Sequence, residues 1–471
     1  MHRRSFCLSA LSSLVAASVG ARELQPTAVD DLRASLAGRL VRPGQPEYDA
    51  ARKVWNGAFD RRPALIVRCS NTNDVIRCVA FAREHQLVVA VRGGGHSFPG
   101  HSTCDGGLLI DLSQMDGIRV DAKARTARVQ PGVVLAQFDR ATQARGLAAT
   151  MGTVSQTGVG GLTLGGGFGR LSRRFGLACD NLIGAEMVTA DGRVVNTSTS
   201  LNPELLWALR GGGGNFGVVT SFEYRLHSVA PEMHGGLLVF PFTQPRALLR
   251  SYADFIAGAS DDLFVMFDIV PTPNGRIAAL EVCHSGGRAA AEHELAGLRK
   301  IGKPLKDAVT PSTYVALQSG IDKDYPAGRG YYLKSGFIRT ITSGVIGTLV
   351  DYLDSASWPR GIASFIQHGG AIARVPPEAT AYWHRNAGHT VLLVGTWDEA
   401  ADAERSTQWA RTGWASLEPQ TEGFYVNFMA PDDSQRRVLR TYGDNHARLA
   451  AVKKKYDPTN LFKLNANIAP A

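Results

Sequence analysis

The chain has 471 residues, of which 44% are hydrophobic and 20% are charged. This composition excludes an intrinsically disordered chain and leaves room for two or three domains of ~150 residues each. The net charge is +9, with 51 glycines. The basic residues are scattered, which indicates an ordinary solvated surface, with a surface that favours acidic partners as the alternative. Nucleic-acid binding has little support. The glycines are clustered without a period, which excludes a collagen-like chain.

Residues 1–21 are interpreted as a targeting segment. Arg3 and Arg4, followed by Phe6, precede an uncharged stretch that ends in small residues at 19–21. The apolar part is short and rich in serine, so no membrane span is predicted. The paired arginines resemble a bacterial twin-arginine export signal, and an ordinary secretory signal is the alternative. We therefore expect a protein exported to the periplasm or secreted.

Residues 22–228 are predicted to form a first α+β domain. Apolar runs at 64–68 and 87–91 flank a helical pattern that starts near Asn71, which predicts a strand–helix–strand unit with parallel strands. Asp191-Gly192 predicts a hairpin turn. Further strands are expected at 108–112, 118–120, 126–129, 182–189, 193–195 and 218–226, with helices at 133–145 and 202–209.

Residues 229–420 are predicted to form a second α+β domain, a sheet backed by helices. Strands are expected at 264–269, 277–283, 363–367 and 391–397, and helices at 289–298, 345–356 and 400–417. The remaining segment, 421–471, is predicted to hold a strand at 424–428 and a helix at 436–455 that Asp457-Pro458 ends.

Two long glycine clusters, at 158–169 and 210–217, and a shorter one at 92–97 carry the strongest chemical signal. Successive backbone amides in such loops form anion-binding nests, so a diphosphate cofactor is favoured over simple turns. Gly106-Gly107 is interpreted as a turn. The stretch 212–217 has the letters of a GxGxxG motif, but a helix precedes it and a strand follows, so a dinucleotide-binding Rossmann unit is not predicted.

Several motifs together resemble the berberine-bridge-enzyme-like FAD-linked oxidases of the vanillyl-alcohol-oxidase superfamily. These motifs are RGGGHS at 92–97, the cluster at 158–169, RFGLACD at 174–180, WALRGGGGNFGVVT at 207–220, YVN at 425–427 and KYDPTNLF at 455–462. The resemblance covers residues 55–228 and 421–471 well. It implies an α+β fold with a PCMH-type FAD-binding domain at 22–228 and a substrate domain at 229–420 whose antiparallel sheet is backed by helices. It also implies that 421–471 returns to the FAD domain.

The same resemblance implies FAD attached covalently through the ring of His96. A neutral imidazole nitrogen is a nucleophile, which suits this bond. Many relatives attach FAD a second time through a cysteine, but Val154 stands at that position, so attachment through His96 only is predicted. Further flavin contacts are implied for Arg92, Gly93, Gly94, Gly95, Ser97, Thr157, Gly158, Gly161, Gly165, Gly166, Gly169, Asp180 and Asn427.

The general base is the main departure from the family pattern. Relatives that oxidise alcohols often end a Tyr-x-Asn-Tyr motif in a tyrosine base, because hydride loss from an alcohol requires loss of the hydroxyl proton. Phe428 stands there and cannot accept a proton. The candidates left are Tyr382, Tyr425 and His384, and the alternative is a chain that lacks the usual base. Thr157, close to valine in volume, mildly favours access of oxygen.

We therefore expect an exported FAD-dependent oxidase that transfers hydride from a small organic substrate, with oxygen forming hydrogen peroxide. The alternatives are a dehydrogenase that uses a quinone or cytochrome acceptor, and a non-catalytic flavin-binding protein. Six cysteines show no CxxC or zinc-like spacing, so no metal is predicted. A disulfide between Cys69 and Cys78 stays open, as do the substrate and the oligomeric state.

Overall fold

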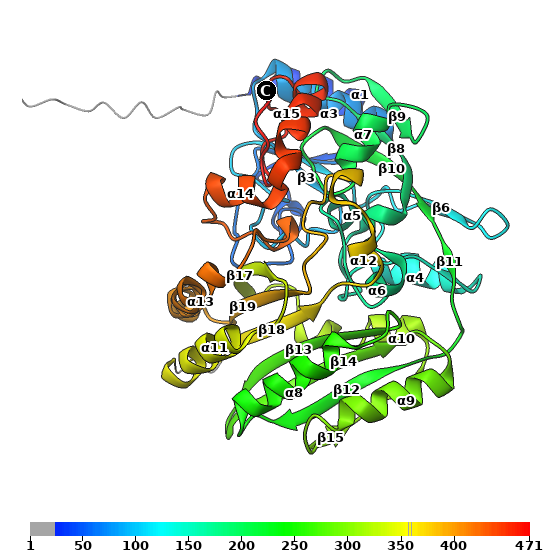
Figure 1. Ribbon diagram of the computed structural model, residues 1–471. Helices are drawn as coiled ribbons and strands as arrows, with labels where there is room; N and C mark the ends of the chain where they lie inside the picture. Colours follow the sequence, from blue (N-terminus) through cyan, green and yellow to red (C-terminus); the bar gives the residue numbers. More distant parts are fainter. Residues whose placement is uncertain (1–23, 357, 359) are drawn as a thin grey trace, which may run out of the picture.

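The computed structural model describes residues 24–356, 358 and 360–471. The predicted export segment at 1–21 lies outside these residues. Helices and sheets alternate along the chain, which confirms the expected α+β class. In Figure 1 two smaller sheets lie in the upper part of the molecule and a large sheet lies below them. Within the described residues, no helix is both long and apolar enough to span a membrane.

The first sheet has four strands in the order β1 (Arg39–Val41), β2 (Leu65–Arg68), β4 (Leu108–Asp111) and β3 (Val89–Arg92). The helices of this part are α1 (Pro26–Ser35), α2 (Tyr48–Ala51) and α3 (Thr72–Glu84). The Asn71 side chain caps α3. The prediction of parallel strands is confirmed, but β2 and β3 do not pair with each other, because each pairs in parallel with β4 between them.

The second sheet has five strands and is antiparallel. Its order is β5 (Ile118–Asp121), β6 (Thr126–Val129), β10 (Val218–Arg225), β8 (Leu182–Val188) and β9 (Val194–Ser198). The predicted hairpin β8–β9 is confirmed, and the predicted strands β5 and β6 also pair with each other as a hairpin. The associated elements are α4 (Leu135–Gln143), α5 (Val159–Leu164), α6 (Ser172–Phe175), α7 (Pro203–Leu209) and the pair β7 (Leu147–Ala148) with β11 (His227–Ser228). The glycine-rich cluster at 158–169 thus contains a short helix, α5.

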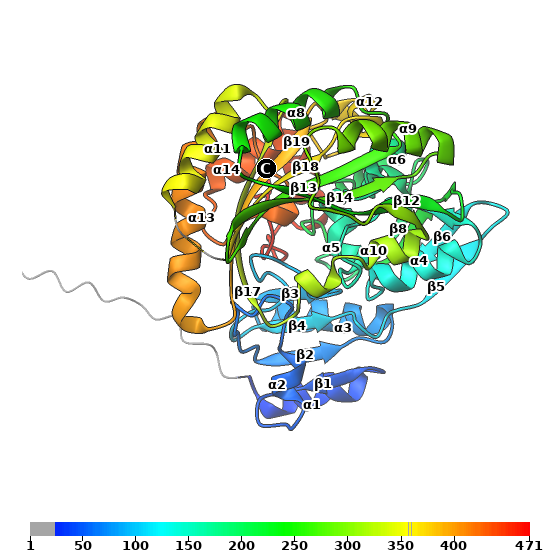
Figure 2. The same cartoon turned by 90° about the horizontal axis from the view of Figure 1, so that it is seen from below.

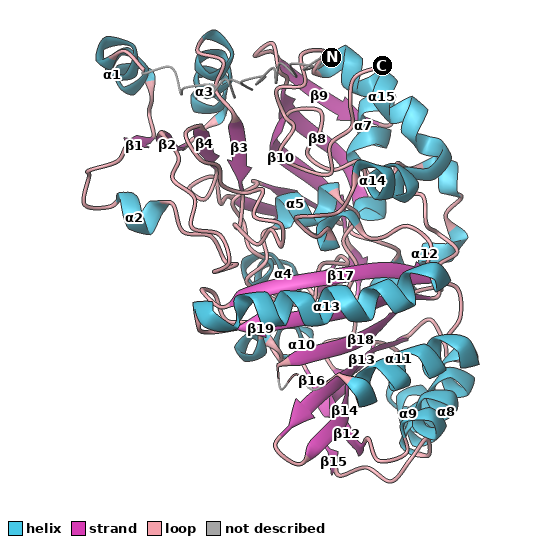
Figure 3. Cartoon of the chain, turned by 90° about the vertical axis from the view of Figure 1, so that its left-hand side faces the viewer, coloured by secondary structure: helices cyan, strands magenta, loops and turns pink. Residues whose placement is uncertain are grey.

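The third sheet is antiparallel and has eight strands. The central path runs β15 (Lys306–Asp307), β12 (Met233–Pro241), β14 (Gly275–His284), β13 (Leu263–Thr272), β18 (Gly361–Gln367), β19 (His389–Trp397) and β17 (Gly330–Ile338), and β16 (Thr310–Ser312) pairs with β12. Helices α8 (Pro245–Ala257), α9 (Arg288–Arg299), α11 (Ser343–Ser355) and α13 (Ala403–Leu417) pack on one face (Figures 2 and 3). The short helices α10 (Tyr314–Gln318) and α12 (Ala371–Arg374) complete this part.

The packing explains why one face of this sheet is covered. Phe267, Phe365 and Leu393 lie in a single buried cluster with side chains of the four helices, such as Tyr252 and Trp409. Because side chains alternate along a strand, the neighbouring positions point to the opposite face. That opposite face turns toward the first two sheets and forms a wall of the cavity described below.

The C-terminal segment differs from the prediction at two places. The predicted strand at 424–428 is wrong: this stretch forms a single 3₁₀ turn at Val426–Phe428. The predicted helix at 436–455 is two helices, α14 (Gln435–Tyr442) and α15 (His446–Tyr456). The break lies at Gly443, which has φ +50° and where a Cβ would lie 2.3 Å from Nε1 of Trp383, so no larger residue fits.

The two C-terminal helices pack on the second sheet rather than on the third. Tyr442 and Leu449 share a buried cluster with Phe216 and Phe222. The ammonium group of Lys453, fully buried, pairs with Asp457 at 2.6 Å and donates to the backbone carbonyl of Asn215 at 2.7 Å. The end of the chain is therefore fixed beside the glycine cluster at 210–217.

Candidate cofactor and substrate site

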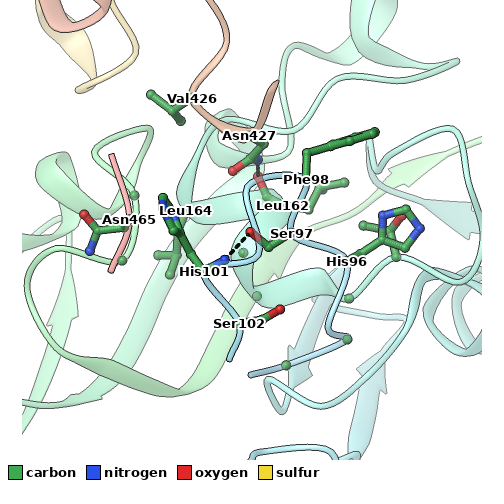
Figure 4. Close-up of a pocket in the computed structure, with 18 of the residues that line it drawn as sticks. His96, Ser97, Phe98, His101, Ser102, Leu162, Leu164, Val426, Asn427 and Asn465 are labelled. Carbon is green, nitrogen blue, oxygen red and sulfur yellow. Dashed lines mark hydrogen bonds between the residues drawn. The ribbon is translucent and has the colours of Figure 1, made fainter. Parts of the chain in front are cut away.

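A cavity of about 320 Å³ lies between the glycine clusters and the open face of the eight-stranded sheet. The segments at 93–102, 152–164, 213–219 and 425–428 contribute to its lining, together with strands of the large sheet. Nine of the predicted flavin-contact residues line it, namely Gly93, Gly94, Gly95, His96, Ser97, Thr157, Gly158, Gly161 and Asn427. Figure 4 shows part of this lining.

The glycines of these loops serve two different purposes. A Cβ on Gly94 would lie 2.4 Å from the backbone nitrogen of Gly158, and a Cβ on Gly158 would lie equally close to Gly94, so these two loops touch through their backbones. A Cβ on Gly161 or Gly214, by contrast, would meet no protein atom within 4 Å among the described residues. These last two glycines leave open space over the cavity, as a closely approaching ligand requires.

His96 is placed as the attachment of a prosthetic group requires. Its ring stacks on Trp55 at 3.9 Å between centroids, and Trp55 stacks in turn on Tyr331 at 4.1 Å. The Nε2 atom is buried and has no hydrogen-bond partner among the described residues. Burial lowers the pKa of His96 to about 4, so its ring is neutral at pH 7. A fixed, neutral imidazole with an unpartnered nitrogen at the cavity wall fits a covalent link to FAD.

Other polar groups at the cavity also lack protein partners. Ser102 Oγ and Asn465 Oδ1 are buried, line the cavity and make no hydrogen bond among the described residues (Figure 4). The backbone N–H of His101 donates to Ser97 Oγ at 3.0 Å, which fixes the loop after His96. Among the residues that the structure describes, no Asp, Glu, Lys or Arg lines the cavity. The residues present therefore fit a ligand whose diphosphate is held by backbone amides rather than by charged side chains.

Of the three candidate bases, only Tyr425 reaches the cavity. Its hydroxyl accepts hydrogen bonds from the backbone N–H of Gly167 at 2.9 Å and from Nδ2 of Asn427 at 2.7 Å. Burial raises the pKa of Tyr425. Tyr382 does not line the cavity but packs over Gly166.

His384 lies away from the cavity as well. Its Nε2 atom lies 3.1 Å from the backbone carbonyl of Arg440. Phe428, by contrast, lines the cavity beside Tyr425, with 5.1 Å between the two ring centroids. Of the positions expected to hold the general base, the cavity therefore contains the phenol of Tyr425 and the phenyl ring of Phe428.

Five predicted flavin contacts lie behind the cavity rather than on it. Asp180 accepts two hydrogen bonds from the guanidinium of Arg385, at 2.7 and 2.8 Å. Arg92 pairs with Asp111 at 2.6 Å. The other three residues are Gly165, Gly166 and Gly169, which pack against Asn427, Tyr382 and the backbone of Met151 respectively. All five residues contact other protein groups and hold the glycine loops in place.

The loop at 152–155 is held from the side of the large sheet. Arg170, which is buried, donates to the backbone carbonyl of Thr153 at 3.0 Å and pairs with Glu281. Asp322 accepts the backbone N–H of Ser155 at 2.8 Å. Val154, in this loop, lines the cavity, and none of the five cysteines in the described part of the chain does.

The buried thiols lie elsewhere. Cys179 is buried behind the cavity, and burial raises its pKa. Cys69 and Cys78 are free thiols with 3.9 Å between their sulfur atoms, too far for a disulfide bond. Among the described residues, no group of three or more His, Cys, Asp or Glu side chains could hold a metal ion.

The wall that the large sheet contributes to the cavity was not predicted from the sequence. Six side chains form it, namely Met266, Leu333, Ser364, Ile366, Leu392 and Val394. These residues alternate with others that face the helices, but because both faces are buried, no alternation of polar and apolar residues marks the wall in the sequence.

Comparison with known proteins shows the family. Residues 63–198 match a family described as an FAD binding domain, and 424–469 match one described as berberine and berberine-like. An FAD-linked oxidoreductase from Dictyostelium discoideum is 34% identical, over 94% of this chain and 97% of the relative. The (R)-6-hydroxynicotine oxidase from Paenarthrobacter nicotinovorans is 32% identical, over 93% and 97% respectively.

A solved structure shows the same fold. The crystal structure of 6-hydroxy-D-nicotine oxidase from Arthrobacter nicotinovorans has a TM-score of 0.86 and 31% identity, and the match covers 93% of this chain and 99% of that one. The predicted family, fold and enzyme class are confirmed. The chain belongs to the berberine-bridge-enzyme-like FAD-linked oxidoreductases, which carry the PCMH-type FAD-binding fold of the vanillyl-alcohol-oxidase superfamily.

Proposed function

We propose that this protein is an exported oxidase in which FAD, attached through His96 alone, takes hydride from a small organic substrate and passes the electrons to oxygen, forming hydrogen peroxide. The observation that carries the proposal is the unpartnered Nε2 atom of His96 at the wall of the cavity, in a chain of this family. A relative named (R)-6-hydroxynicotine oxidase supports a small organic substrate. The proposed substrate is an alcohol, a sugar, or a phenolic or other natural product.

The chain's own residues prepare the attachment. Stacking on Trp55 fixes the plane of the His96 ring, and burial keeps the ring neutral at pH 7, so a lone pair is available on the unpartnered nitrogen. Val154 offers no sulfur for a second bond. These contacts support one covalent link through the imidazole and none through the loop at 152–155.

The rest of the cavity controls water and protons. The wall from the large sheet is apolar except for Ser364, so it excludes water from the reacting centre. Tyr425 is held by two donated hydrogen bonds, so its own hydroxyl hydrogen is the only proton it can offer. Thr157 lines the cavity, and its small side chain supports access of oxygen.

Two measurements test this function. The mature protein is isolated from the culture medium or the periplasm, and its N-terminus is sequenced. It is then incubated in air with a panel of alcohols, sugars, phenolics and amines, and hydrogen peroxide is measured. We expect cleavage near residue 21 and at least one substrate that gives about one peroxide per product. Turnover only with a quinone or cytochrome would identify a dehydrogenase, and failure of every substrate to bleach the flavin without oxygen would contradict an enzymatic role.

A further inference from the structure

The part of the cavity next to the large sheet has a mainly apolar lining. We call it the substrate end and define it by the six side chains of the sheet wall together with the rings of Phe98, Phe168, Tyr425 and Phe428. The ring of Phe428 meets Phe98 edge to face at 5.6 Å and Phe168 edge to face at 5.5 Å. Apart from Ser364, all of these side chains belong to one hydrophobic cluster. A flat, mainly apolar ring fits such a lining.

The hydroxyl oxygen of Tyr425 already accepts two hydrogen bonds at this end. The backbone N–H of Gly167, which can only donate, lies 2.9 Å from it, and Nδ2 of Asn427 lies 2.7 Å from it. The orientation of the Asn427 amide is fixed, because the same Nδ2 atom donates to the backbone carbonyl of Leu162 at 3.2 Å and a carbonyl can only accept. Two donors therefore occupy both lone pairs of the phenol oxygen.

The hydroxyl hydrogen of Tyr425 is left without a protein acceptor. Within the part of the chain that the structure describes, the two donors are the hydroxyl's only hydrogen-bond partners. Burial raises the pKa of Tyr425 above its ordinary value, although the two hydrogen bonds lower it, so the phenol keeps its hydrogen at pH 7. The side chain is buried and lines the cavity. Because an unpaired buried donor is unfavourable, this hydrogen is available to a molecule bound in the cavity.

The charge of the cavity indicates which acceptor suits this donor. Among the described residues no lysine or arginine lines the cavity, and the ring of His96 is neutral at pH 7. A carboxylate or phenolate at the substrate end would lose its hydration and meet no cation, which costs more than one hydrogen bond returns. A neutral carbonyl, ether or ring nitrogen loses less on leaving water. The electrostatics therefore favour a neutral acceptor.

We propose that the substrate end takes a ring-bearing, mainly apolar compound with a neutral hydrogen-bond acceptor, and that the Tyr425 hydroxyl donates to this acceptor. Tyr425 is then a specificity-determining donor and not the general base, since both lone pairs of its oxygen are occupied. The inference rests on the proposed function, because it names the substrate class of the same site.

Two probes of nearly the same shape test the inference in the purified, flavin-containing chain. Acetophenone carries a carbonyl group where α-methylstyrene carries a methylene group, and neither is an alcohol or amine, so binding is measured without turnover. Binding is followed by the change in flavin absorbance. We expect Tyr425→Phe to weaken acetophenone binding about fivefold and to change α-methylstyrene binding less than about twofold, since one neutral hydrogen bond is lost.

A matched control and a second readout separate recognition from folding. Tyr382→Phe makes the same chemical change in the same hydrophobic cluster, at a tyrosine that does not line the cavity, and we expect it to leave both affinities unchanged. Infrared spectra of acetophenone labelled with ¹³C at the carbonyl need no variant. We expect the C=O stretch of the bound probe at a lower frequency than in hexane, because a donated hydrogen bond weakens the C=O bond. If Tyr425→Phe does not fold, this band decides alone.

Three results would overturn the inference: an equal loss for both probes in Tyr425→Phe, the same selective loss in Tyr382→Phe, or a bound carbonyl band at its hexane position. The proposed function fails separately. A colourless chain, or one that forms no peroxide with any substrate, refutes that function while the infrared band still reports the donor. A flavin-containing, peroxide-forming chain whose bound carbonyl band is unshifted refutes only the assignment of Tyr425.

Discussion

The ion pair between Arg385 and Asp180 gives a quantitative test of how the glycine loops are held. Arg385 is fully buried, and its guanidinium donates to both carboxylate oxygens of Asp180, to Thr380 and to the backbone carbonyl of Tyr382. Asp180 also accepts the backbone N–H of Leu177 at 2.8 Å. The pair therefore joins the segment around residue 382 to the loop that follows α6.

Replacing Arg385 by Met leaves the Asp180 charge buried without its partner. Removal of one partner of a buried pair costs about 3–5 kcal/mol of unfolding free energy. Asp180→Asn keeps an acceptor for the Leu177 N–H, so in the double variant the stranded charge is gone. We expect the double variant to be about 2 kcal/mol more stable than Arg385→Met alone.

Urea unfolding followed by tryptophan fluorescence measures these differences. Bound flavin, measured after acid precipitation, is a second readout, and we expect Asp180→Asn to keep it, because Asp180 does not line the cavity. A loss below about 1 kcal/mol in Arg385→Met, or a double variant that loses the sum of both single losses, would refute this reasoning.

Three further predictions concern other parts of the chain. Gly161→Ala should fold with unchanged or slightly higher stability, since alanine is favoured over glycine in helix α5 by about 0.5–1 kcal/mol. It should bind less flavin, because its methyl group enters the open space of the cavity. Full flavin occupancy of this variant would contradict the prediction. Burial raises the pKa of Glu294, but hydrogen bonds from His284 and from Ser260 lower this pKa to about 2. The stability that this carboxylate contributes is therefore present above pH 4.5 and lost as the pH falls toward 2, and acid unfolding of Glu294→Gln should depend less on pH in this range. Cys69 and Cys78 should resist alkylation in the native protein, and both should react after unfolding without reductant. A native disulfide, seen as a mass lower by two hydrogen atoms, would contradict the free thiols of the structure.

Much of the fold could be predicted because local signals agreed with the tertiary structure. The Asp191-Gly192 turn and the caps before α3 lie where the sequence places them. The glycine loops were also predicted to form a ligand site, and their contact through Gly94 and Gly158 explains why side chains are missing there.

Other features depend on partners distant in the chain. Strand β17 was missed because Lys334 and Ser335 interrupt its apolar residues, whereas β19, which is also buried along its whole length, has an unbroken apolar run at 391–394. The break at Gly443 arises from contact with Trp383, 60 residues earlier, which no local pattern reveals. Residues 424–428 have strand-like composition, yet this stretch turns because Tyr425 and Asn427 reach back to the glycine loop.

Only part of the candidate site could be predicted, because some of its residues also depend on partners distant in the chain. His96 could be found from its motif, whereas Asp180 was assigned to the flavin although its partner is Arg385, 205 residues later. Ser364 carries no motif and lines the cavity only through its place on β18 in the large sheet. Sequence motifs thus identified the cofactor end of the cavity, and only the sheet identified the substrate end.

Peptide mapping of the purified protein tests the central claim most directly. The chain is unfolded in acid, digested with trypsin and analysed by mass spectrometry, beside His96→Ala as control. The account predicts one flavin-modified peptide, which contains residue 96, and none at residue 154 or in the control. A peptide modified elsewhere, or flavin released entirely on unfolding, would contradict it.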